Sequence, residues 1–151
     1  MRGMTRNRRR PLRPSRPPAP VLGPSVLIAD DDPDQRQLYA AYFAWRGFRV
    51  RTASDGEIAV LRALESVPDV VIMDLSMPRV DGWEATRRLR SDPRTAHVPI
   101  VACTAHAFGA PVERALAAGC DAYVVKPCTP PELFREVERL LARRVDRRRP
   151  A

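Results

Sequence analysis

The most constraining feature of this chain is a regular alternation of short apolar runs with amphipathic stretches. The runs are rich in Val and Ile, and they comprise VLIA (26–29), FRV (48–50), VVIM (70–73), IVAC (100–103) and YVV (123–125). Three of them are unbroken by polar residues, which is typical of parallel strands buried on both faces. We therefore expect five strands in one parallel sheet.

Helix signals lie between these runs. Asp32 precedes Pro33 and stands three residues before Gln35, which predicts an N-cap followed by a first-turn proline. The same capping spacing recurs at Ser54/Glu57, Asp81/Glu84 and Thr129/Glu132, and helix stops are expected at Gly47 and Gly119. The last helix carries an apolar stripe of Leu133, Phe134, Val137, Leu140 and Leu141. The (βα)₅ pattern predicts an α/β fold, a doubly wound five-stranded parallel sheet with helices on both faces.

The first 24 residues differ in composition from the rest. They contain seven arginines, six prolines and no acidic residue, and so supply +7 of the formal net charge of +8. Such a segment has too little apolar surface to offset its ordering entropy, so 1–24 is predicted to be a disordered Arg/Pro-rich tail. Its adjacent arginines suggest an export signal, but Pro-rich sequence follows where an apolar stretch should stand.

Cysteine usage and hydropathy indicate the compartment. Cys103, Cys120 and Cys128 lack the spacing of a metal site, and Cys103 lies in an apolar run, where a buried free thiol is expected. No apolar run approaches the length of a membrane span, so no membrane association is expected. Free thiols without a signal peptide indicate the cytoplasm.

Polar residues gather where the predicted strands end. In open α/β sheets this carboxyl edge is where ligands bind. The second strand, ending in Arg51-Thr52, adds nothing distinctive, whereas the others contribute Asp30, Asp31 and Asp32, then Asp74, Thr104 and Lys126. Convergent carboxylates repel one another, and Mg²⁺, which binds carboxylates, waters and phosphate oxygens, would compensate their charge. A carboxylate beside Mg²⁺ and an ammonium can act as a nucleophile toward a phosphoryl group.

Lys126 is the single lysine among 26 basic residues. An ammonium is a compact point charge on a flexible stem, so it can reach carboxylate and phosphoryl oxygens in a crowded pocket. The planar fork of arginine demands a wider bidentate geometry. The choice of lysine here therefore favours a phosphoryl site.

With these residues placed, the chain resembles the receiver domain of bacterial response regulators. The resemblance rests on VLIADDD, VVIMDLSMPRVDGWEATRRLR, PIVACTA and AYVVKPCTPPE, and on the spacing between them. It implies a flavodoxin-like fold with strand order 2-1-3-4-5. The receiver domain is expected at 25–142, followed by a basic C-terminal tail at 143–151 that leaves no room for an output domain.

The resemblance also implies a role for each matched residue. Asp74 would be the phosphoacceptor, Asp31 would bind Mg²⁺ directly, and Asp30 would support the ion largely through water. The metal set would be completed by Asp74 and by the backbone carbonyl of Ser76. Thr104 would bond the phosphoryl group and Lys126 would pair with it, while Thr104 and Tyr123 would form the switch. The remaining implied positions are the loop residues Met77-Pro78 and Asp81-Gly82, a cis Pro127, and His106, which would tune the lifetime of the phosphoryl group. Cys128 departs from the bulkier apolar residue that the family often has.

These inferences predict a stand-alone, chemotaxis-regulator-like receiver. It would accept a phosphoryl group from a histidine kinase or a histidine phosphotransfer protein, and would not be an enzyme in the usual sense. It would then switch binding of a downstream protein through the surface of the fourth helix, fifth strand and fifth helix, as a monomer or a phosphorylation-dependent dimer.

Two alternatives stand beside this prediction. An aspartate-nucleophile phosphatase of the haloacid dehalogenase type needs D-x-D, but here Asp74 is followed by Leu75 and Ser76, and no cap insertion is present. Weak, nonspecific nucleic-acid contact by the arginine-rich tail is the other alternative, since seven arginines could contact phosphates without reading sequence.

Overall fold

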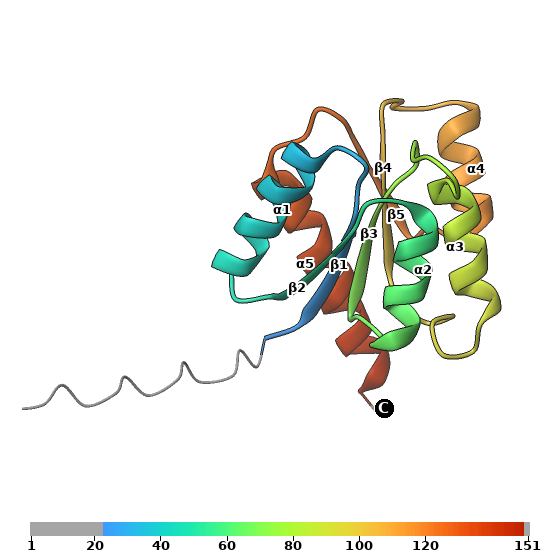
Figure 1. Ribbon diagram of the computed structural model, residues 1–151. Helices are drawn as coiled ribbons and strands as arrows, with labels where there is room; N and C mark the ends of the chain where they lie inside the picture. Colours follow the sequence, from blue (N-terminus) through green and yellow to red (C-terminus); the bar gives the residue numbers. More distant parts are fainter. Residues whose placement is uncertain (1–22, 150–151) are drawn as a thin grey trace, which may run out of the picture.

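The computed structural model describes residues 23–149. Strands and helices alternate along the chain as β1 (Ser25–Ala29), α1 (Pro33–Trp45), β2 (Arg49–Ala53), α2 (Gly56–Glu65), β3 (Val70–Asp74), α3 (Gly82–Ser91), β4 (Ile100–Thr104), α4 (Ala110–Ala118), β5 (Ala122–Val125) and α5 (Pro130–Arg148). The strands form one parallel sheet in the order β2-β1-β3-β4-β5 (Figure 1). The predicted fold class and strand order are confirmed.

Helices cover both faces of the sheet, with α1 and α5 on one side and α2, α3 and α4 on the other (Figure 1). Val26 and Ile28 of β1 face the first side, where they pack in one cluster with Phe43 and Leu133. Leu27 faces the second side, where its cluster includes the helical alanines Ala59, Ala63, Ala85 and Ala115. Every residue of β3 and β4 is buried, which explains why these strands are continuous apolar runs.

The second strand begins and ends one residue later than predicted. The run FRV at 48–50 predicted its position, but β2 extends from Arg49 to Ala53. It pairs with β1 in an unbroken parallel register from Ser25↔Arg49 to Ala29↔Ala53. Because β2 lies at the edge of the sheet, it tolerates the half-buried polar residues Arg51 and Thr52, at which the sequence placed its end.

Six helix ends bear on the predicted caps and stops. Asp32 caps α1 and Asp81 caps α3 as predicted, and only Thr129 with Glu132 completes a reciprocal capping box. The prediction of Ser54 as the cap of α2 was wrong, because the cap is Asp55, whose carboxylate accepts a hydrogen bond from the Ile58 amide at 2.8 Å. Gly47 and Gly119 adopt positive φ at the ends of α1 and α4, as predicted for helix stops.

The last helix continues past the point where the sequence placed a basic tail. Residues 143–148 belong to α5, and Arg144 anchors them by donating to the Asp69 carbonyl at 3.0 Å. At the other terminus, residues 1–22 of the predicted tail lie outside the described residues, whereas the Gly23 carbonyl accepts a bond from the Arg49 side chain. No helix within 23–149 combines the length and apolarity needed to cross a bilayer.

Candidate functional site

Four polar side chains meet at the carboxyl edge of the sheet. Asp74 and Thr104 are the last residues of β3 and β4, and Asp30 and Lys126 follow β1 and β5 directly. Because these strands are neighbours in the sheet, their ends converge even though the residues are up to 96 positions apart. Asp30, Asp74 and Thr104 are all buried. Burial is unusual for carboxylates such as Asp30 and Asp74, so it indicates a specialised environment. The structure brings the side chains of Asp30, Asp31, Asp74 and Lys126 together, and their roles stay predictions.

Three carboxylates form a compact acidic cluster. Asp30, Asp31 and Asp74 each offer an oxygen, and these atoms all lie within 4.8 Å of one another. Asp31 is exposed while the other two are buried, so the cluster opens to solvent on the Asp31 side. Hard divalent cations are bound by such carboxylate oxygens together with waters. The residues present therefore fit Mg²⁺ through both their chemistry and their spacing.

Lys126 is the cation of the site. Its Nζ lies 3.1 Å from Asp30 Oδ2 and 3.3 Å from Asp74 Oδ2, so one ammonium bridges two buried carboxylates. The backbone of Lys126 is held as well, because its amide donates to the Thr104 carbonyl at 2.7 Å. One ammonium facing three carboxylates leaves an excess of negative charge.

This excess charge and the burial of the site set the protonation of its groups. Burial raises the pKa of Asp74 from 3.8 to about 6, with Lys126 acting to lower it and Asp30 acting to raise it. For Lys126, burial acts to lower the pKa, but the Asp74 and Asp30 carboxylates outweigh this and raise the pKa above its ordinary value. At neutral pH Asp74 is therefore mainly an ionised, poorly solvated carboxylate, which suits a nucleophile.

The loop between β3 and α3 orients Asp74. The Ser76 amide donates to Asp74 Oδ1 at 3.2 Å and so fixes the carboxylate relative to the loop. The loop folds back tightly, since Gly82 N donates to the Leu75 carbonyl and a Cβ on Gly82 would lie 2.2 Å from the Asp74 carbonyl oxygen. Only glycine fits there, which gives the predicted Asp81-Gly82 pair a steric reason. The Ser76 carbonyl as a metal ligand stays a prediction.

A contact that the sequence did not predict ties this loop to α2. Asp55 is buried, and its second carboxylate oxygen lies 3.3 Å from Arg79 Nη1. Arg79 adopts a left-handed φ of 62°, and the Gly56 amide donates to the Val80 carbonyl at 3.0 Å. The sequence carries one signal for this latch, the Asp55-Gly56 pair after β2. The capping spacing of Ser54 and Glu57 pointed to the residue before this pair instead.

The two predicted switch residues lie in neighbouring strands, Thr104 at the end of β4 and Tyr123 within β5. The Thr104 hydroxyl accepts a hydrogen bond from the His106 amide at 3.1 Å. Tyr123 in β5 is 39% exposed, so its side chain is not enclosed by the core. The two residues belong to neighbouring strands but share no hydrogen bond within 23–149, and their coupling stays a prediction.

Two further predictions concern the Lys126–Pro127 bond and the cysteines. The Lys126–Pro127 peptide bond is cis, as predicted. Cys128 is half-buried, and its sulfur lies 3.3 Å from the Tyr39 hydroxyl, which also donates to the Cys128 carbonyl. Cys103 and Cys120 are buried, and all three cysteines are free thiols, as expected for Cys103.

Comparison with known proteins decides the family. Residues 26–138 match the family described as the response regulator receiver domain. The chain belongs to this receiver family. The phosphate regulon transcriptional regulatory protein PhoB of Rhizobium meliloti is 38% identical over 120 residues, covering 80% of this chain and 53% of that protein. The polar-differentiation response regulator DivK of Brucella anthropi is 32% identical over 117 residues, covering 78% of this chain and 95% of that protein.

A solved receiver structure agrees with the fold. The receiver domain of the sensor histidine kinase PA1611 from Pseudomonas aeruginosa is 34% identical, with a TM-score of 0.74 over 80% of this chain and 98% of that chain. That protein holds a magnesium ion coordinated in its active site cleft. The present receiver spans about half the length of PhoB and of two other transcriptional regulators that it matches. It is a receiver domain of two-component signalling.

Proposed function

We propose that this receiver accepts a phosphoryl group on Asp74 from the phosphohistidine of a sensor histidine kinase or a histidine phosphotransfer protein. The position of Asp74 carries the proposal. It is buried at the end of the central strand β3, it belongs to the acidic cluster, and its carboxylate lies 3.3 Å from the Lys126 ammonium.

The chemistry follows from this environment. An oxygen of the ionised Asp74 carboxylate forms a bond to phosphorus while the P–N bond to the donor histidine breaks. The electron pair of that bond stays on the imidazole nitrogen that held phosphorus. The other ring nitrogen keeps its proton, so the donor histidine departs as a neutral imidazole. Such transfers depend mainly on positioning and on neutralising charge. The Ser76 amide fixes the attacking carboxylate, and Lys126 stands beside it.

We further propose that Asp30, Asp31, Asp74 and the Ser76 carbonyl hold Mg²⁺, which would offset negative charge on the carboxylates and the phosphoryl oxygens when bound. The fit of the acidic cluster supports this. Lys126 can turn from Asp74 toward a phosphoryl oxygen, because its stem is flexible and its ammonium already lies within 3.3 Å.

The output would be a change of partner binding. A phosphoryl group adds charge and acceptor oxygens, and Thr104 and Tyr123 would relay its presence. The altered surface would comprise α4, β5 and α5, which would contact a downstream protein, with the receiver acting as a monomer or a phosphorylation-dependent dimer. We propose a cytoplasmic phosphoacceptor and not an enzyme acting on other substrates. The free cysteines support the compartment.

Labelling tests the proposal. The full chain is incubated with Mg²⁺ and phosphoramidate, or with a panel of phosphorylated histidine kinases, and the phosphoprotein is measured by intact mass. Wild type should acquire a hydroxylamine-sensitive acyl phosphate, and Asp74→Asn should not. Asp69→Asn, at the opposite edge of the sheet, is the matched control and should be labelled as wild type. Equal labelling of Asp74→Asn would remove Asp74 from this role.

A further inference from the structure

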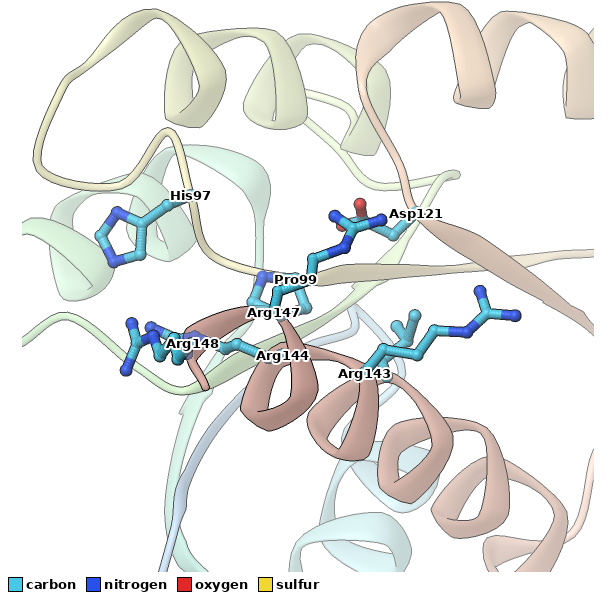
Figure 2. A pocket seen from close by; sticks show the side chains of 8 residues that line it. His97, Pro99, Asp121, Arg143, Arg144, Arg147 and Arg148 are labelled. Atoms are coloured by element: carbon cyan, nitrogen blue, oxygen red, sulfur yellow. The ribbon is translucent and has the colours of Figure 1, made fainter. Parts of the chain in front are cut away.

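The end of the molecule opposite Asp74 carries a cluster of arginines that the phosphoacceptor site does not use. Four arginines from the last turns of α5 line a cavity of about 320 Å³. They are Arg143, Arg144, Arg147 and Arg148, and the wall across from them includes His97 and Pro99, which precede β4 (Figure 2). Since α5 starts beside Lys126 and runs back along the sheet, this end lies away from the acidic cluster (Figure 1).

Three of the four arginines form no ion pair within the described part of the protein. Arg144 donates a hydrogen bond to the Asp69 carbonyl. The Asp121 carboxylate in the cavity wall forms an ion pair with Arg90 at 2.7 Å and accepts a hydrogen bond from the Ile100 amide at 2.8 Å. Within residues 23–149, no carboxylate forms an ion pair with Arg143, Arg147 or Arg148. All three are exposed, so their guanidinium groups are available to an external anion.

The helix dipole accounts for only part of this arrangement. Basic residues in the last turn of a helix offset its negative end, and Arg147 and Arg148 are placed to do so. That effect fades within one turn, and so does not explain Arg143 or the shared cavity. Leu140 and Pro99 also line this cavity, so the four arginines border one shared, partly apolar hollow.

The second basic part of the chain is joined to the same end. Pro24 lies in a neighbouring cavity with Arg144, Val145 and Arg148, so the described chain begins beside the end of α5. Residues 1–22, which precede it in the sequence, contain seven arginines and no acidic residue. Pro24, near the start of the described residues, therefore lies close to the arginines at the end of α5.

We infer that this arginine end binds the phosphate backbone of duplex nucleic acid without reading its sequence. Guanidinium groups match phosphate oxygens bidentately. They do not converge on one point, since Arg143 and Arg148 point to opposite sides in Figure 2, which suits a row of phosphates better than a single small anion. None of the eight lining residues is Phe, Tyr or Trp, so there is no platform on which single-stranded bases could stack.

The test measures binding of a fluorescein-labelled 20-base-pair duplex by anisotropy, as a function of salt, with the full chain. The test variant combines Arg143→Gln, Arg147→Gln and Arg148→Gln. The control variant combines Arg62→Gln, Arg87→Gln and Arg135→Gln, which are exposed and remove the same charge elsewhere. Each lost phosphate contact lowers the slope of log affinity against log salt by about 1, so the test variant should lose about 3 and the control less than about 1.

The outcomes separate this site from general charge and from the phosphoacceptor. Asp74→Asn should bind the duplex as wild type does, so failure of the phosphoryl-transfer proposal would leave this one standing. Equal losses in the two triple variants, or no wild-type binding at low salt, would overturn the inference. So would stronger binding to vesicles of phosphatidylserine and phosphatidylcholine that depends on the same arginines. Competition by free ATP in EDTA at equal phosphate concentration would show a small-anion site instead, and would also overturn it.

Discussion

Replacing Asp74 by Asn should stabilise the protein when no divalent cation is present. The substitution removes the charge but keeps the shape and an acceptor oxygen for the Ser76 amide. The pKa of Asp74 rises from 3.8 to about 6, and each unit corresponds to about 1.36 kcal/mol, which gives an upper value of about 3 kcal/mol. Water at the open side of the site screens part of this, so we expect the free energy of unfolding to increase by about 2 kcal/mol at neutral pH.

The effect should depend on pH in a defined direction. The folded protein holds the Asp74 proton more tightly than the unfolded chain does, so ionising Asp74 costs stability. This cost is fully present above a pH of about 6 and is absent once the pH falls below 3.8. The advantage of Asp74→Asn over wild type should therefore be largest near neutral pH and approach zero at about pH 4.

Urea unfolding in EDTA, followed by circular dichroism across this pH range, measures the difference. Adding Mg²⁺ should stabilise wild type more than Asp74→Asn and so narrow the gap, because the ion binds the folded acidic cluster. Asp146→Asn removes an exposed carboxylate and should change stability by less than about 0.5 kcal/mol. An Asp74→Asn variant no more stable than wild type in EDTA, or a gain unaffected by pH, would refute the reasoning.

Three further predictions concern the same edge of the sheet. Asp31→Asn should weaken Mg²⁺ binding on the order of 10–100-fold by calorimetry, and an unchanged titration would place the metal elsewhere. The Lys126→Arg variant should still accept a phosphoryl group, but its Tyr123 rearrangement and its partner binding should be impaired. If the phosphorylated variant binds its partner as tightly as wild type does, the geometry of the ammonium is irrelevant. Asp55→Ala should cost about 1 kcal/mol of stability through the lost cap, and should also weaken Mg²⁺ binding by freeing Arg79 and its loop. An Asp55→Ala variant with unaltered Mg²⁺ affinity would show that the contact between Asp55 and Arg79 does not position the metal site.

The fold could be predicted because its central strands are buried on both faces. A continuous apolar run such as VVIM is demanded by that burial, and parallel pairing then brings the following polar residues to one edge. This is why the sequence alone suffices to place Asp30, Asp74 and Lys126 together. Their ion pairs follow from the strand order, which the resemblance to the receiver family supplied.

Features that depend on the sheet edge or on loop contacts were harder to predict. β2 lies at the edge of the sheet and contains the polar residues Arg51 and Thr52, so its apolar pattern is weak and its bounds were placed one residue too early. The capping spacing favoured Ser54 over Asp55, whose partner Arg79 is 24 positions away and meets it only through the fold of the β3–α3 loop. The end of α5 was also misplaced, because an arginine-rich helix end resembles a solvated tail until the contact of Arg144 with Asp69 is seen.

The central claim is that phosphorus bonds to Asp74, and mapping that bond tests it most directly. Wild type is phosphorylated in Mg²⁺, reduced with borohydride, digested and sequenced by tandem mass spectrometry. An aspartyl phosphate is reduced to homoserine, so homoserine should appear at position 74 and at no other aspartate. Homoserine at Asp30 or Asp31, or a phosphoryl group stable to borohydride on another residue, would contradict the account.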